Sequence, residues 1–244
     1  MERWIFYEKM LLKHINKNSN FLLISGSEKE IQILKKLRYK NFKITYHKEL
    51  NRNIENNYNL LVGKNLFDAD VRNLRFNDSE FDYVITNATL HHIDVPHVGI
   101  SEMYRVAKKG VLIIESNDSL IMRLACKIKL SEEFEESSVD RHKKTGGLLD
   151  LGIPNYVYRW TENEVEKLIS SFNPKYNHVI SYNYEFEFEN ILKKINNKFL
   201  KSVISFFLKV NLKMLKFAFK KQSNLFSFFI NKKLSKKNKH SWIN

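Results

Sequence analysis

An α/β fold built on a mainly parallel sheet is predicted by three features of the sequence. Short apolar runs alternate with helical patterns, as they do in βαβ units. The runs that read as buried strands cover residues 21–25, 42–47, 81–86 and 110–116. The segments 28–39 and 99–109, which lie among them, carry apolar residues every three to four positions and so predict helices. A content of 43% hydrophobic and 28% charged residues, with seven glycines and three prolines, fits one compact domain with additions.

The chain divides into five predicted parts. A helix over residues 1–20 precedes a core over 21–116, and the polar, glycine-containing segment 117–160 interrupts the pattern as an insertion that would cap a substrate. Periodicity resumes at residue 161, where Thr161 and Glu164 have the spacing of a capping box. The C-terminal part of the core, 161–231, holds strand candidates at 178–188 and 224–230, which we expect to pair as an elaborated hairpin. A basic tail, 232–244, follows.

The net charge of +14 is localised at one end of the chain. Residues 190–244 contain fourteen lysines and no acidic residue, so they account for the whole excess. Residues 190–221 have the pattern of a basic amphipathic helix whose lysines exclude a bilayer span. Three interpretations remain open. The apolar face packs on the protein's own sheet, which is the default, or it lies on an anionic membrane surface, or it binds nucleic acid, which the lack of a recognised binding module disfavours.

The cysteine and histidine content argues against disulfides and clustered metal sites. Cys126 is the single cysteine, which fits a reducing compartment. The N-terminal segment carries charges throughout and lacks the apolar core of a signal peptide, so we expect a cytoplasmic protein, peripheral to the inner face of the membrane if the basic helix binds there. Four histidines, at positions 14, 97, 142 and 178, lack metal-ligand spacing, and no metal is predicted.

Residues 70–115 carry a family resemblance. They include Phe-Asp-Tyr-Val from Phe81, Leu-His-His from Leu90 and Glu-Met-Tyr-Arg-Val from Glu102. This pattern resembles the small-molecule branch of the class I S-adenosylmethionine-dependent methyltransferases. The resemblance implies a Rossmann-like sheet with helices on both faces, S-adenosylmethionine as cofactor, and methyl transfer to a small molecule. A looser similarity of 146–161 and 224–228 to relatives from surface-polysaccharide gene clusters suggests a sugar or glycan precursor as acceptor.

The resemblance also implies the cofactor-binding positions. Asp70 stands where the family's acidic residue approaches the adenine amine, and Val71 would pack on the ring. Asn87 and Ala88 follow the fourth predicted strand, at the edge where α/β sheets bind ligands. The complete implied set is Ser25, Gly26, His47, Glu49, Asp70, Val71, Asn87 and Ala88.

The sequence departs from the family pattern upstream of residue 70. One glycine of the expected three remains, Gly26, and Glu28 and Glu30 replace the others. Glutamates there would repel the carboxylate of the cofactor and attract its ammonium and sulfonium groups. His47 replaces the acidic residue that accepts the ribose hydroxyls, with Glu49 as a substitute. These changes favour a second interpretation, in which the chain is a catalytically inactive binding or scaffold protein of the same fold. A third interpretation is a membrane-surface adaptor that acts through the basic helix.

Two groups of residues are candidates for catalysis and substrate binding. His91 and His92 would serve as general base for an acceptor hydroxyl, since imidazole titrates near neutral pH. The alternative, favoured for His91, is that these side chains pack under the next helix or bond the loop. Asn155, Tyr156 and Arg159 offer hydrogen bonds and a flat ring to a polar substrate. Arg159 is the best candidate for a ligand contact. The alternative for Tyr156 is a structural role, in which its ring packs on the edge of the sheet as part of an aromatic lid.

Overall fold

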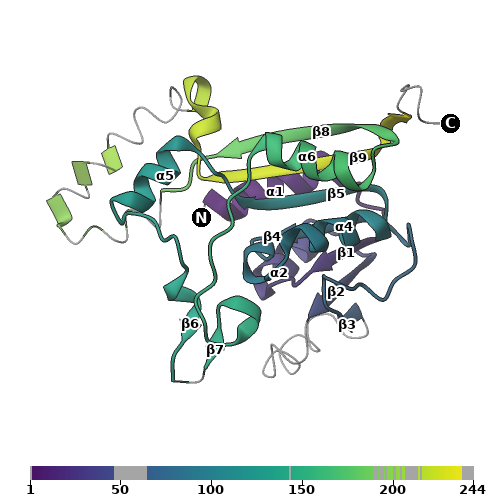
Figure 1. The fold of residues 1–244 in the computed structure, drawn as a ribbon, viewed down its shortest axis with the longest axis horizontal. Coiled ribbons are helices and arrows are strands. Elements are labelled where there is room, and N and C mark those ends of the chain that lie inside the picture. Colours follow the sequence, from purple (N-terminus) through teal and green to yellow (C-terminus); the bar gives the residue numbers. More distant parts are fainter. Residues whose placement is uncertain are drawn as a thin grey trace.

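The computed structural model contains a seven-stranded sheet in the order β3-β2-β1-β4-β5-β9-β8 (Figure 1). It describes residues 2–46, 65–142, 144–188, 192, 195, 197–199, 202–203, 205–206, 214 and 216–237. The five strands from β3 to β5 run parallel, whereas β9 runs antiparallel to both β5 and β8. The strands are β1 (Phe21–Ile24), β2 (Phe42–Tyr46), β3 (Leu66–Asp68), β4 (Phe81–Asn87), β5 (Ala107–Ser116), β8 (Tyr176–Glu185) and β9 (Leu225–Lys237).

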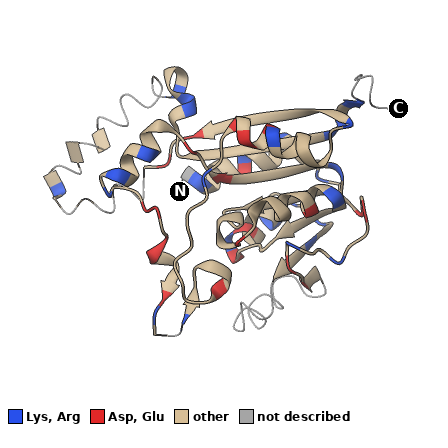
Figure 2. Ribbon diagram, in the orientation of Figure 1, with Lys and Arg blue, Asp and Glu red and all other residues tan. Residues whose placement is uncertain are grey.

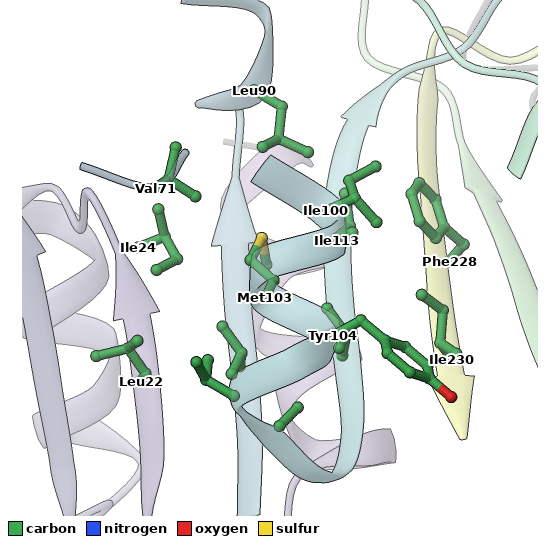
Figure 3. Close-up of a cluster of buried hydrophobic side chains, with 14 of the residues drawn as sticks. Leu22, Ile24, Val71, Leu90, Ile100, Met103, Tyr104, Ile113, Phe228 and Ile230 are labelled. Atoms are coloured by element: carbon green, nitrogen blue, oxygen red, sulfur yellow. The ribbon is translucent and has the colours of Figure 1, made fainter. Parts of the chain in front are cut away.

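Helices cover both faces of this sheet. One face is covered by α4 (Pro96–Val106) and α6 (Glu162–Phe172), the other by α1 (Glu2–His14) and α2 (Glu28–Lys36). Ile100, Met103 and Tyr104 of α4 lie against side chains of β1, β5 and β9 (Figure 3). The predicted α/β class with helices on both faces is therefore confirmed.

The two-sided cover explains why the strand runs are apolar throughout. All four residues of β1 are buried. Leu22 and Ile24 belong to the cluster under α4 and α6, while Phe21 and Leu23 belong to the cluster under α1 and α2. Because successive strand residues point to opposite faces, a strand covered on both sides needs an uninterrupted apolar run.

The predicted hairpin of strands 178–188 and 224–230 is present as β8 and β9, with shifted ends. β9 continues to Lys237, which pairs with Tyr176, so the predicted boundary of a basic tail at residue 232 is wrong within the described residues. β5 begins at Ala107, three residues before the predicted strand, because Ala107 pairs with Phe81 of β4. The proline at the first position of α4 starts that helix earlier than the apolar pattern indicated. β3 was not predicted, since three residues carry too little pattern.

The insertion 117–160 holds α5 (Leu120–Lys127), the two-stranded ribbon of β6 (Val139–Asp140) and β7 (Thr145–Gly146), and two short 3₁₀ helices, η3 (Glu136–Ser138) and η4 (Leu148–Asp150). It extends away from the central sheet (Figure 1). Its last residue, Trp160, is fully buried and packs against Tyr158 and Phe228. That indole anchors the insertion to the core.

Half of the predicted basic helix 190–221 lies outside the described residues, as do His47 and Glu49. The part that the structure describes ends in a 3₁₀ turn, η5 (Lys220–Gln222), next to α5. None of the helices described is long and apolar enough to cross a membrane.

We predict that Phe228→Ala destabilises the protein by about 3–5 kcal/mol, because this side chain is fully buried between β9 and α6 and its removal leaves a cavity. Phe217→Ala is the matched control, since its ring is 88% exposed, and should change the free energy of unfolding by less than about 0.5 kcal/mol. Urea unfolding of both variants measures the difference. Equal stabilities would show that the hairpin is not part of the core.

Candidate functional site

A cavity of about 450 Å³ opens at the carboxyl ends of β1, β2 and β4. Its walls come from the turns after β1 and β4, from the last residues of β2, from the N-terminus of α1, and from the insertion at Ser138, Gly146–Gly147 and Leu149–Asp150. Small-molecule sites of α/β sheets lie at this edge, and the volume is in their usual range. Ser25, Gly26, Asn87 and Ala88, four residues predicted to bind a cofactor, all line it.

The backbone is strained on both sides of the cavity floor. Ser25, at the end of β1, has a φ of 49°, and Ala88, at the end of β4, has a φ of 53°. Residues other than glycine rarely adopt this left-handed conformation, and strain of this kind concentrates at functional sites. Gly26 has an ordinary φ, but a Cβ atom there would lie 2.4 Å from Cδ2 of Leu23. The one glycine that the turn retains is therefore required by packing.

Glu30 has a structural role that the sequence analysis missed. Ser27 and Glu30 form a capping box at the start of α2: the Ser27 side chain accepts from the Glu30 amide, and Oε2 of Glu30 accepts from the Ser27 amide at 2.7 Å. Glu30 is 3% exposed. Burial raises the pKa of its carboxyl, against the hydrogen bonds from Ser27 and the positive charge of Arg3, which lower it. Glu28, in contrast, is exposed and bonds Gln32.

Three buried polar atoms of residues that line the cavity have no hydrogen-bond partner. They are Oε1 of Glu30, Oδ1 of Asn87 and Nε of Arg3. The nearest ionic partner of Arg3 is Glu187, with Nε 3.8 Å from Oε2. Leaving such atoms buried and unpaired costs about 1–3 kcal/mol each. Two acceptors and one cationic donor therefore lie beside the cavity without a hydrogen bond of their own, and the side chain of Asn87 is close enough to Glu30 to lower the pKa of its carboxyl.

A buried carboxylate organises the loop after β4. Glu115, at the end of β5, is fully buried. Its Oε1 accepts from the amides of Thr89 and Leu90 at 2.9 and 2.8 Å, and its Oε2 lies 2.6 Å from Nδ1 of His91. Burial alone would raise the pKa of Glu115, but the charge and hydrogen bond of His91 hold it below its usual value. Burial works against protonated His91 as well, yet Glu115 and Glu135 together raise the pKa of this histidine.

His92 occupies a different environment from His91. It lines the cavity and its side chain is 34% exposed, whereas His91 is 7% exposed and faces a second cavity behind it. Burial and the neighbouring His91 lower the pKa of His92. Both Nε2 atoms approach Oε2 of Glu135, at 3.6 Å from His91 and 3.7 Å from His92. The fold thus brings both predicted histidines to one carboxylate of the insertion.

The two residues predicted to contact adenine lie outside the cavity lining. Asp70 forms a bidentate ion pair with Arg72, whose Nη1 also bonds Asp94 at 2.9 Å. Val71 is 6% exposed and packs in the core beside Gly99. Their cofactor contacts remain predictions, as do those of His47 and Glu49.

The three predicted substrate residues are spread over the insertion. Asn155 is fully buried; it donates to the backbone carbonyl of His91 at 2.9 Å and lies 3.4 Å from Oε2 of Glu135. Tyr156 is half exposed on the outer surface against Phe134. Arg159 donates to the carbonyl of Glu132 at 2.5 Å, which holds the insertion together, and its Nε is left buried without a partner.

Sequence reasoning missed Arg3, Glu115 and Glu135. Arg3 and Glu135 stand in segments without a motif, and only the tertiary fold brings Arg3 to the cavity and Glu135 to the two histidines. Glu115 was within a predicted strand, and a charged residue in an otherwise apolar run was the signal that could have identified it, since buried charges are paired.

The sheet order, the single antiparallel strand and a cavity at the carboxyl edge define a Rossmann-like fold of the class I methyltransferase type. Solved structures share it. A SAM-dependent methyltransferase from Archaeoglobus fulgidus has a TM-score of 0.55 at 15% identity, with 94% of each chain covered. The plantazolicin methyltransferase BpumL, solved in complex with SAH, has a TM-score of 0.52 at 15% identity, with 94% of this chain and 82% of that chain covered. The PH0226 protein from Pyrococcus horikoshii OT3 has a TM-score of 0.53, also at 15% identity, with coverages of 94% and 89%.

Residues 25–114 match the sequence model of a family described as "Methyltransferase domain". The match runs from the turn after β1 to Ile114 within β5, and it includes the turns that form the cavity floor. The sequence match over these residues and the shared fold agree with the resemblance to class I methyltransferases. No curated protein matches the sequence.

We predict that Glu115→Gln lowers the free energy of unfolding by about 3–5 kcal/mol, because a buried His91 loses its charged partner while the loop amides keep an acceptor. Glu133→Gln, on the exposed surface of the insertion, is the control and should have an effect within about 0.5 kcal/mol. Chemical unfolding measures both. An unchanged Glu115→Gln protein would mean that the pair does not hold the loop.

Proposed function

We propose that the protein transfers the methyl group of S-adenosylmethionine to an oxygen or nitrogen of a small polar acceptor, with a sugar or glycan precursor as the acceptor class. One observation carries the proposal: the cavity at the carboxyl edge of the sheet is lined by four of the predicted cofactor-binding residues together with Glu30 and Arg3. Neither the fold nor the comparisons favour the alternative of an inactive scaffold.

The unsatisfied atoms complement the amino-acid end of the cofactor. Oε1 of Glu30 and Oδ1 of Asn87 would accept from its ammonium group, and the guanidinium of Arg3 would donate to its carboxylate. Glu30 thus has two functions, since its other oxygen caps α2. The charge of Arg3 offsets the repulsion that we expected between the glutamates and the cofactor carboxylate.

The acceptor would enter between the insertion and η2 (Leu90–His92). When bound, the cofactor supplies an electrophilic methyl group on a sulfonium, so the chain's main task is to align the nucleophile. His92, which lines the cavity, would contact the acceptor hydroxyl, with Ser138 and Asp150 on the insertion side. His91 is buried and bonded to Glu115, and it positions His92 and the loop.

We predict opposite effects of Glu30→Gln on stability and on binding. Glutamine keeps the capping box but removes the buried carboxyl group, whose pKa is raised by burial. Because burying that charge is unfavourable, the free protein should melt at the same or a higher temperature. The affinity for S-adenosylhomocysteine should fall about 10- to 100-fold, because one charge-assisted hydrogen bond to the ammonium is lost. Calorimetric titration and thermal melting measure the two quantities.

Glu28→Gln is the matched control for this experiment, because Glu28 lies in the same turn and is exposed. It should leave both quantities unchanged. Equal affinities of wild type and Glu30→Gln would contradict the placement of the ammonium group, and absence of any binding to the wild-type protein would contradict the proposed function itself.

We also propose that the protein docks on an anionic membrane surface, through a patch that we define as α5 together with Phe217 and Phe219. Leu120, Leu124 and Ile128 of α5 are 74%, 58% and 58% exposed, and Phe217 is 88% exposed. Basic residues lie in the same elements: Arg123, Lys127 and Lys129 belong to or directly follow α5, and Lys220 and Lys221 belong to η5, which contacts α5 (Figure 2). An apolar helix face rimmed by cations fits the interface of a negatively charged bilayer.

We predict that Leu124→Asp abolishes co-sedimentation with phosphatidylglycerol vesicles, because it places a charge in the apolar face and adds repulsion from the lipid. Val98→Asp is the control, as Val98 is 44% exposed on α4, outside the patch, and it should bind as wild type does. Binding should weaken at high salt and be absent with neutral phosphatidylcholine. Equal binding of the two variants, or a wild-type dimer that Leu124→Asp dissociates, would refute the membrane assignment.

A further inference from the structure

The cluster of His91, His92 and Glu135 has the composition and spacing of a metal site. Its three ligand atoms, the two Nε2 atoms and one oxygen of Glu135, lie within 4.8 Å of one another. The contacts to the carboxylate are 3.6 and 3.7 Å. The imidazole rings are tilted by 42° with centroids 4.5 Å apart, so they converge on the carboxylate without stacking.

These distances are close to those that a bound ion requires. Zinc binds histidine nitrogen and carboxylate oxygen at about 2.0–2.2 Å, so two ligand atoms of a tetrahedral site lie roughly 3.3 Å apart. The two contacts to Glu135 would contract by a few tenths of an ångström, and the separation of the two histidine nitrogens, which lie within 4.8 Å of each other, would contract by up to about 1.5 Å. His92 and Glu135 have side chains that are 34% and 30% exposed, so both have room to adjust.

The surroundings of His91 match the outer shell of a metal site. Its Nδ1 lies 2.6 Å from the fully buried Glu115, which leaves Nε2 directed at the cluster. A ligating histidine almost always bonds a carboxylate or carbonyl through its other nitrogen, which fixes its tautomer and orientation. Glu115 is itself fixed by the amides of Thr89 and Leu90, and Asn155 lies 3.4 Å from Oε2 of Glu135. Glu115 therefore positions the ligand His91 and Asn155 positions the ligand Glu135, before any ion binds.

The charge of the cluster also favours a divalent cation. Glu115 and Glu135 contribute two negative charges beside two imidazoles. A divalent ion bound by two neutral histidines neutralises both negative charges, whereas one proton on the histidine pair neutralises only one of them. The sequence analysis predicted no metal because it tested histidines by their spacing along the chain, and here the carboxylate comes from the insertion.

We propose that His91, His92 and Glu135 bind one divalent transition metal ion of the zinc type. Three protein ligands leave a coordination position open, as in catalytic zinc sites, and His92 places this position beside the methyl-transfer cavity. Resting on the proposed function, the inference assigns that position to the acceptor hydroxyl. Coordination lowers the pKa of the hydroxyl, which releases its proton to water; the oxygen then forms the bond to the methyl carbon while the sulfur–carbon bond breaks and sulfur keeps the electron pair.

The test uses the full chain after removal of metals with a chelator. Titration with Co²⁺, followed by visible absorption, and with Zn²⁺, followed by calorimetry, should give one site per chain. His92→Ala and Glu135→Gln should each weaken binding at least 10-fold, with circular dichroism showing that both fold. His97→Ala is the matched control, because Nε2 of His97 lies 3.7 Å from Glu164 in a pair that lacks a second histidine, and it should bind as wild type does.

Absence of Co²⁺ and Zn²⁺ binding to the wild-type protein, or binding that both cluster variants retain, would overturn the proposal and leave a hydrogen-bonded histidine pair. Calorimetry with S-adenosylhomocysteine on the metal-free protein separates this outcome from failure of the proposed function. If the nucleoside binds and the metals do not, only the metal site is wrong.

Discussion

The carboxylate of Glu115 is the interaction on which the site depends. It ends a strand that is buried on both faces, where a lone charge would be costly. Its two oxygens are satisfied by the loop after the neighbouring strand β4: one accepts from two amides and the other pairs with His91. That loop carries His92 into the cavity, and the carbonyl of His91 accepts from Asn155, which ties the insertion to the same point. One buried charge therefore fixes the core, the loop and the insertion relative to one another.

Much of the fold could be predicted from the sequence because burial on two faces leaves a strong pattern. The runs that became β1, β2, β4 and β5 are apolar since each contacts helices above and below the sheet. Strand ends were less predictable: Ala107 and Lys237 belong to strands because they pair with Phe81 and Tyr176, and pairing partners far away in the sequence leave no local signal.

The site was predicted in part, and the division has a physical reason. Ser25, Gly26, Asn87 and Ala88 follow strands, and the carboxyl ends of parallel strands meet at one edge whatever the family. Arg3 and Glu135 come from a helix and an insertion whose packing decides what they face, so no spacing along the chain could place them. At position 70 the sequence has the acidic residue that the family pattern requires, but in the structure the side chain of Asp70 forms an ion pair with Arg72.

The altered glycine turn is best understood as an exchange of one binding arrangement for another. A glycine-rich turn brings bare backbone to the cofactor, whereas this chain strains Ser25 and Ala88 into the left-handed region and puts side-chain atoms of Glu30, Asn87 and Arg3 around the cavity. The strain and the unsatisfied atoms both raise the free energy of the empty protein. In the proposed function, a zwitterionic ligand pairs with the side chains of Glu30, Asn87 and Arg3, so the loss of two glycines at Glu28 and Glu30 would not prevent binding.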